Sequence, residues 1–140
     1  HAALELLLKK MSDLEGKFMV IAAGYSREME QFLDSNSGLR RRFGLTLHFE
    51  DYNPDELMEI SKHYLKENEL TEEAELLLFS HYEKLYNNRN RTFGNAGFAK
   101  KVISQTIHNR DYRMTTLGTS QISEDEKKKI EADDIVLIDS

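Results

Sequence analysis

The sequence predicts an α/β segment over residues 1–50, followed by an all-helical domain over residues 51–140. An apolar run at 18–23 and alternating apolar residues at 45–49 indicate strands between helices in the first part. A helix-capping sequence at 51–56 marks a change of pattern, and apolar residues at helical spacing follow it. We therefore place a domain boundary at this change.

The α/β segment has the order helix, strand, short helix, strand. An amphipathic helix that ends at Glu15 and Gly16 is indicated by Leu4, Leu7, Leu8, Met11 and Leu14. The run 18–23 is apolar throughout, as in a strand buried on both faces of a parallel sheet. Ser26 is a candidate cap for the short helix, and residues 34–38 form a turn cluster.

Capping signals predict the helices of the second part. Asn53 is a good N-cap, Pro54 suits the first helical position, and Glu56 complements the exposed amides. Thr71 caps a second helix, and a third begins after Phe93-Gly94-Asn95.

The end of the chain is predicted less completely. Residues 115–120 are typical of a loop, and Ser123 with Glu126 predicts a short capped turn. Residues 130–138 suit either a last helical turn or a short strand, and we leave both open.

Composition excludes several classes of function. Hydrophobic residues make up 39%, which is enough for a core, and the absence of cysteine excludes disulfides and thiolate metal sites and suits the cytoplasm. Residues 1–49 hold seven basic and six acidic residues, and residues 50–140 hold twelve and nineteen, so the first part carries +1 and the second −7 of the net charge of −6. An acidic domain argues against nucleic-acid binding. No segment suits a signal peptide or a membrane span. We therefore expect neither nucleic acid nor a membrane as a partner.

Three ordered blocks carry a family resemblance. The first block comprises Val20 to Tyr25, Met29, Asn36, Gly38, Leu39, Arg42 and Phe43. It resembles the VIxAGY…M…NPGLxxRF block of AAA+ ATPases of the CbbX and stage V sporulation protein K type. Residues 49–57 resemble the family's FxDYxPEEL sequence, and residues 93–96 resemble the start of its FGNAR motif.

This resemblance implies the end of a P-loop AAA+ core over residues 1–50 and a helical lid over residues 51–140. The family couples ATP hydrolysis in a ring, usually a hexamer, to chaperone-like remodelling of a protein partner. Its phosphate-binding loop and magnesium-binding strand would precede His1, and no G-x-x-x-x-G-K-[ST] occurs here. We expect a longer parent that binds ATP and Mg²⁺, neighbouring subunits of a homo-oligomeric ring as partners, and no hydrolysis or tight nucleotide binding by this chain alone.

The resemblance places an arginine finger at Arg42, with Arg41 as the second candidate and Arg40 at the surface. A finger stabilises charge on the γ-phosphate in the neighbouring subunit's site, which suits a planar guanidinium that is always charged. A solvated basic patch is the alternative interpretation of three consecutive arginines.

Further nucleotide-sensing positions follow from the same resemblance. Tyr25 stands at the sensor 1 position, although it could equally close a strand end, and Gly24 would give backbone space near the nucleotide. Asn95 and Gly97 begin the third helix of the lid. Gly97 replaces the family's sensor arginine, so that Lys100 or Lys101 would have to substitute unless both are simply solvated.

No histidine or carboxylate spacing suits a metal site, and we assign none. His81 lies on an apolar helix face, where a satisfied core or edge histidine is expected. The lid is expected to hinge near Asn53 and Pro54. The rival hypothesis is a stand-alone helical protein-interaction module without a nucleotide role, whose arginines contact an acidic partner.

Overall fold

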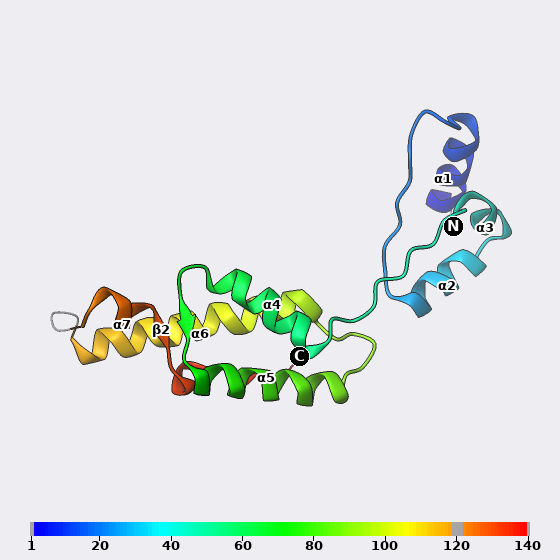
Figure 1. Ribbon diagram of the computed structural model, residues 1–140. Helices are drawn as coiled ribbons and strands as arrows, with labels where there is room; N and C mark the ends of the chain where they lie inside the picture. The colour runs from blue at the N-terminus through cyan, green and yellow to red at the C-terminus, as the bar shows by residue number, and fades with distance from the viewer. Residues whose placement is uncertain (1, 119–121, 140) are drawn as a thin grey trace. The chain divides into compact units, whose positions relative to one another are not determined.

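The computed structural model describes residues 2–118 and 122–139, and it divides into two units at residues 50 and 51 (Figure 1). The first unit contains α1 (Ala2–Asp13), α2 (Ser26–Asp34) and α3 (Ser37–Arg42). The predicted first helix is therefore confirmed. Gly16, with φ of +78°, follows its end in the left-handed region that glycine adopts without strain.

The centre of the first unit is small. Leu39 is completely buried, and Leu33 is nearly so. The rings of Phe32 and Phe43 meet edge to face with centroids 6.0 Å apart, which joins α2 to the end of α3.

The structure corrects the two strands predicted in this unit. Residues 18–23 and 45–49 have no β-ladder partner among the described residues. Ile21 is 83% exposed and Phe49 is 87% exposed, so their apolar side chains are not covered. A single strand cannot satisfy its own backbone groups, because every ladder hydrogen bond needs a neighbour. The α/β character of the first unit is thus only weakly expressed in this chain.

One local prediction in this unit is also wrong, and another is confirmed in part. Tyr25 occupies the N-cap position of α2, and the Ser26 hydroxyl instead lies 3.4 Å from Nδ1 of His48. The turn predicted at 34–38 is present at Ser35 and Asn36, but α3 already begins at Ser37. Asn36 caps this helix by accepting a 2.8 Å hydrogen bond from the Gly38 amide.

The second unit packs α4 (Pro54–Leu65) and α5 (Glu72–Asn87) with the long α6 (Asn95–Leu117) (Figure 1). Its core comprises Leu57, Met58, Leu65, Ala74, Leu78, Tyr82, Phe93, Phe98, Ala99, Val102, Ile103, Ile130 and Ile135. The predicted all-helical class is confirmed for these three elements.

The capping predictions are confirmed by direct contacts. Asn53 Oδ1 accepts from the Glu56 amide, and the Glu56 carboxylate accepts from the Asn53 amide, both at 2.9 Å. Thr71 Oγ1 accepts from the amide of Ala74 at 3.2 Å. These reciprocal bonds satisfy amides that have no partner within the helix itself.

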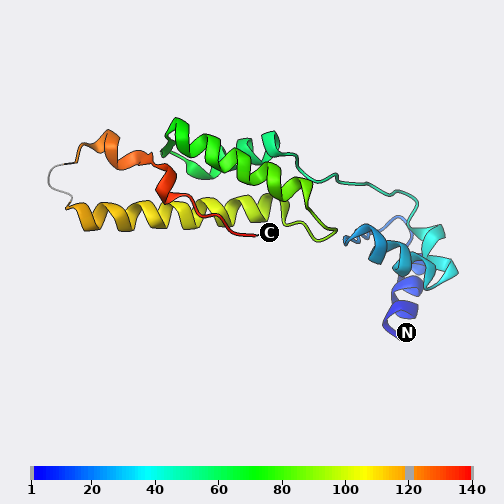
Figure 2. The same cartoon turned by 90° about the horizontal axis from the view of Figure 1, so that it is seen from below.

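The C-terminal segment returns along α5 and α6 (Figure 2). The predicted capping box at Ser123 is present and starts α7 (Glu124–Lys128). After it come β2 (Lys129–Ile130) and a 3-10 turn, η2 (Ala132–Asp134). β2 pairs in parallel with β1 (Glu69–Leu70), so both alternatives left open for this region occur in part.

Polar bonds also hold the residues that follow η2 to the helices. The Val136 amide donates to Thr106 Oγ1 at 3.1 Å, and His81 Nε2 lies 2.8 Å from the Ile138 carbonyl, to which it must donate. His81 is thus satisfied, as predicted. The loop predicted at 115–120 is wrong at its start, because α6 continues to Leu117, whereas residues 119–120 lie outside the described residues. No described helix combines the length and apolar character needed to cross a membrane.

The hydroxyl of Tyr82 lies in the core of the second unit. Ser61 Oγ donates to the Leu57 carbonyl at 2.8 Å, so the Tyr82 hydroxyl donates to Ser61 Oγ across 2.7 Å. Burial raises the pKa of Tyr82 to about 12.

We expect stability to fall as pH rises from 10 to 12. In this window the unfolded state loses the Tyr82 proton while the folded state keeps it, which lowers the free energy of unfolding by about 2 kcal/mol. Urea denaturation across this range should show the decline, and Tyr82→Phe should remove that part of it. An identical slope in both proteins would contradict the assignment.

Candidate functional site

The helix α3 brings the three predicted arginines to its last turn. Arg40 is bound to two carboxylates of α2: its Nε donates to Asp34 Oδ1 and its Nη2 to Glu30 Oε2, each at 2.8 Å. Arg41 is exposed and makes no ion pair or hydrogen bond through its side chain with any described residue. The arginine tract is therefore not a uniform basic patch.

Arg42 is held in a different direction from Arg40. Its Nη1 donates to the Gly38 carbonyl at 3.2 Å, and its Nη2 donates to Ser12 Oγ on α1. A side chain at Gly38 would place a Cβ 3.0 Å from Arg42 Nη1 and 3.1 Å from Asn36 Oδ1. Glycine at this position thus leaves room for the guanidinium against the helix.

The predicted sensor 1 position lies at the start of α2. Tyr25 is 54% exposed, and its carbonyl accepts the Met29 amide at 2.8 Å. A Cβ at Gly24 would lie 3.1 Å from the sulfur of Met29, so the space beside this glycine is partly filled by that side chain. The structure does not bring Tyr25 into contact with the arginines through any hydrogen bond among the described residues.

The amide of Asn95 is already used within the helical unit. Its Oδ1 accepts from the Tyr52 amide at 2.8 Å, and its Nδ2 donates to Asp51 Oδ1 at 2.9 Å and to the Phe93 carbonyl at 3.0 Å. An asparagine side chain can form four hydrogen bonds, so these three leave only the second lone pair of Oδ1 without a partner named here. A role of Asn95 toward nucleotide stays a prediction.

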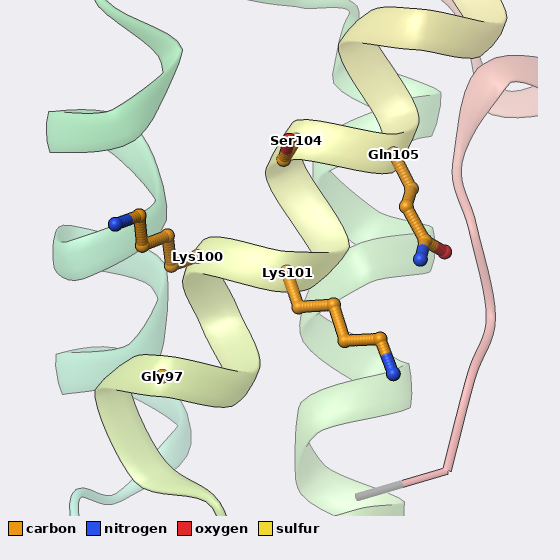
Figure 3. A pocket seen from close by; sticks show the side chains of 5 residues that line it. All are labelled: Gly97, Lys100, Lys101, Ser104 and Gln105. Atoms are coloured by element: carbon orange, nitrogen blue, oxygen red, sulfur yellow. The ribbon is translucent and has the colours of Figure 1, made fainter.

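The first turns of α6 form a surface depression beside Gly97. It is lined by Gly97, Lys100, Lys101, Ser104 and Gln105, and carries no carboxylate (Figure 3). A Cβ at Gly97 would meet no atom within 4 Å, so a longer side chain would fit there. The depression is therefore open to solvent, and its charged lining residues are the two lysines.

The two lysines of this depression do not converge on one point. Lys100 points toward α4, where its ammonium lies 5.9 Å from the centre of the Tyr64 ring, while Lys101 points to the other side of α6 (Figure 3). A single phosphate could therefore meet only one of them in this arrangement. Of the two candidates for the missing sensor arginine, neither is selected by the geometry.

The sequence pattern does not reveal the residues that position the predicted ones. Ser12 contacts Arg42 from thirty residues earlier in the chain, and the Asp51 carboxylate accepts hydrogen bonds from both Asn95 and Arg89. A possible signal was Gly94-Asn95, because asparagine tolerates positive φ and often marks a special backbone position.

Comparison with known proteins gives a match to the AAA lid domain over residues 53–140. Stage V sporulation protein K of Bacillus subtilis is 37% identical over 115 residues, 80% of this chain and 36% of that protein. The ESX-5 secretion system protein EccA5 of Mycobacterium marinum is 34% identical over 127 residues, 81% of this chain and 21% of that protein. The protein CfxQ homolog of Pyropia yezoensis is 32% identical over 136 residues, 96% of this chain and 45% of that protein. The chain thus spans less than half the length of these relatives.

Proposed function

The chain belongs to the AAA lid domain family, and on this premise we propose that it is the nucleotide-sensing and subunit-coupling part of an AAA+ ATPase. The whole protein would use ATP hydrolysis in a homo-oligomeric ring to remodel a protein partner. One observation carries the proposal: a helical unit that matches the lid comes, after residues 43–50, behind a helix whose last turn holds three arginines.

The arginine-bearing helix supports the coupling role. Arg42 is held at the end of α3 by the Gly38 carbonyl and Ser12, which reduces the entropy lost when a guanidinium meets a phosphate. We propose that it reaches the γ-phosphate bound by a neighbouring subunit, where it stabilises developing negative charge. Arg41 remains the second candidate.

The lid side supports a weaker contact with the nucleotide. Gly97 opens a depression in which Lys100 or Lys101 could supply one positive charge, in place of a sensor arginine. The chain offers neither a phosphate-binding loop nor its lysine, so ATP and Mg²⁺ would be held by the preceding part of a longer protein. The exposed apolar segments 18–23 and 45–49 would be strands completed by the sheet of that part.

Titration of the ¹⁵N-labelled chain with ATP and ADP in the presence of Mg²⁺ tests this proposal. We expect no saturable amide shifts, because one or two cations without an amide cradle bind a triphosphate weakly. The same titration of a longer protein that includes the preceding segment should show saturable shifts, with turnover of ATP.

Two results would contradict the proposal in different ways. Saturable micromolar binding centred on Tyr25 or Asn95 would mean that this chain carries most of the nucleotide site itself. A longer protein without a phosphate-binding loop or ATP turnover would favour the stand-alone interaction module, whose arginines contact an acidic partner.

A further inference from the structure

We propose that Asn95, together with Asp51 and Arg89, locks residues 51–52 onto the start of α6, so that the chain pivots before Asp51. The sequence suggested a hinge near Asn53 and Pro54. The inference goes beyond the proposed function, because it concerns the segment 51–52 through which the chain enters the helical unit, and it needs no nucleotide.

The first part of the lock is the side chain of Asn95. Its backbone has φ of +48°, a left-handed conformation that costs energy for a residue with a side chain unless its surroundings hold it there. Hydrogen bonds of the Asn95 side-chain amide offset this cost: its oxygen accepts from the Tyr52 amide at 2.8 Å, and its nitrogen donates to Asp51 at 2.9 Å. Asn95 therefore grips both residues of the connecting segment.

The second part of the lock is the carboxylate of Asp51. One oxygen accepts from Asn95, and the other accepts from Nε of Arg89 at 3.0 Å. Arg89 is itself fixed at the end of α5, since its Nη1 donates to the Tyr86 carbonyl at 2.7 Å and its guanidinium lies 3.7 Å from the centre of the Tyr86 ring. The connecting segment, the end of α5 and the start of α6 are thus joined by one network.

The next residues of the chain are also committed to the helical unit. Asn53 caps α4 through the reciprocal bonds with Glu56, and Pro54 is the first residue of that helix. Residues 51–54 therefore have no free rotation left without breaking hydrogen bonds. Immediately before them, the side chains of Phe49 and Glu50 are each 87% exposed, so backbone rotation there disturbs little packing.

The position of the lock links it to the open depression on α6. Asn95 lies two residues before Gly97, in the same helical turn. A displacement of this turn would therefore be passed to residues 51–52 through direct bonds, rather than be absorbed by a flexible hinge. Asn95 acts in this network as a positioning residue.

Amide hydrogen exchange of this chain, read residue by residue by NMR, tests the lock. In the Asn95→Gly variant the left-handed backbone is retained without strain, and only the side-chain bonds are lost. We expect the Tyr52 amide to exchange about tenfold faster, while Leu78 and Val102 in the helix interiors keep their protection.

A second variant and a matched control sharpen the test. Asp51→Ala should accelerate the Tyr52 amide as well, because Asn95 loses one of its partners, and the double variant should show less than the product of the two effects. Asn90→Ala serves as control, because the Asn90 side chain accepts hydrogen bonds from Thr92 in the same loop and forms none with Tyr52 or Asp51 in the described part of the chain.

The proposal is overturned if Tyr52 exchanges at the wild-type rate in both Asn95→Gly and Asp51→Ala. It is also overturned if Leu78 and Val102 accelerate by the same factor as Tyr52. The first result would show that the bonds do not restrain the segment. The second would make Asn95 a residue of general stability.

Discussion

Replacement of Arg113 by alanine is expected to lower the free energy of unfolding of the helical unit by about 3 kcal/mol. The guanidinium forms a two-pronged contact with Asp134, Nε to Oδ1 at 2.8 Å and Nη2 to Oδ2 at 2.7 Å. The Asp134 side chain is 3% exposed, so the variant leaves a buried carboxylate without its cation. The same carboxylate accepts from the Glu131 amide and thereby holds η2, which would loosen together with it.

The pH dependence of this loss follows from the Asp134 carboxyl. Burial by itself raises the pKa of Asp134, but the hydrogen bonds from Arg113 and from the Glu131 amide outweigh it and lower the pKa below its usual value. A lowered pKa in the folded state stabilises the protein above the usual aspartate range, and this contribution is lost as pH falls through the folded value. In Arg113→Ala the carboxyl should protonate at higher pH, so the variant should differ less from wild type in acid.

Urea denaturation of wild type and Arg113→Ala at pH 7 and pH 3 measures both effects. Lys127→Ala is a suitable control, because Lys127 pairs at 2.7 Å with the exposed Glu124, and an exposed ion pair contributes little to stability. A loss at pH 7 no larger than that of the control would show that the buried pair adds nothing to stability.

The helix boundaries of the second unit were predictable because their signals are local. Asn53 and Glu56 are three residues apart, and so are Ser123 and Glu126. The reciprocal bonds within each pair depend on helix geometry alone. The end of α6 was not predictable in this way, because Thr115 and Thr116 are tolerated in its last turn, where both hydroxyls donate to the Tyr112 carbonyl. The pattern of polar residues there suggested a loop.

The two strands predicted in the first unit were wrong because strand formation depends on distant parts of the chain, not on local signals. Residues 18–23 have the composition of a buried strand, but a ladder needs a neighbour at a specific register. The only parallel pairing among the described residues joins two dipeptides, Glu69–Leu70 and Lys129–Ile130, which lie about sixty residues apart and carry no strand pattern. Composition predicts what a segment can bury, and only the tertiary structure decides whether a partner is present.

The candidate site, too, could be predicted only in part from the sequence. Arg42 and Gly97 could be named from sequence by resemblance to a family, because each stands in a short ordered motif. Their surroundings could not, since Ser12 reaches Arg42 across thirty residues and Asp51 reaches Asn95 across forty-four. Such contacts leave no periodic signal, so the bonds of Asn95 to residues 51 and 52 could not be predicted from the sequence.

In a longer protein that carries the phosphate-binding loop, Arg42→Ala is expected to reduce ATP hydrolysis about a thousandfold or more and to leave ATP binding unchanged. The guanidinium would act on charge that develops in the transition state, so its loss affects turnover rather than ground-state affinity. Arg42→Lys should restore little, because an ammonium cannot reproduce the planar fork that contacts Gly38 and Ser12. Steady-state hydrolysis and equilibrium nucleotide binding measure the two quantities separately.

Arg41→Ala provides the matched comparison, because Arg41 lies on the same turn and makes no side-chain bond with the described residues. Full turnover in Arg42→Ala together with loss of turnover in Arg41→Ala would assign the finger to Arg41. Full turnover in both variants would show that α3 takes no part in catalysis.

Mixing the variant subunits decides whether the finger acts between subunits. Arg42→Ala subunits still bind ATP, and subunits without the phosphate-loop lysine still carry Arg42. Mixed rings should therefore recover part of the activity that neither variant has alone, whereas a finger that acts within its own subunit would give no recovery.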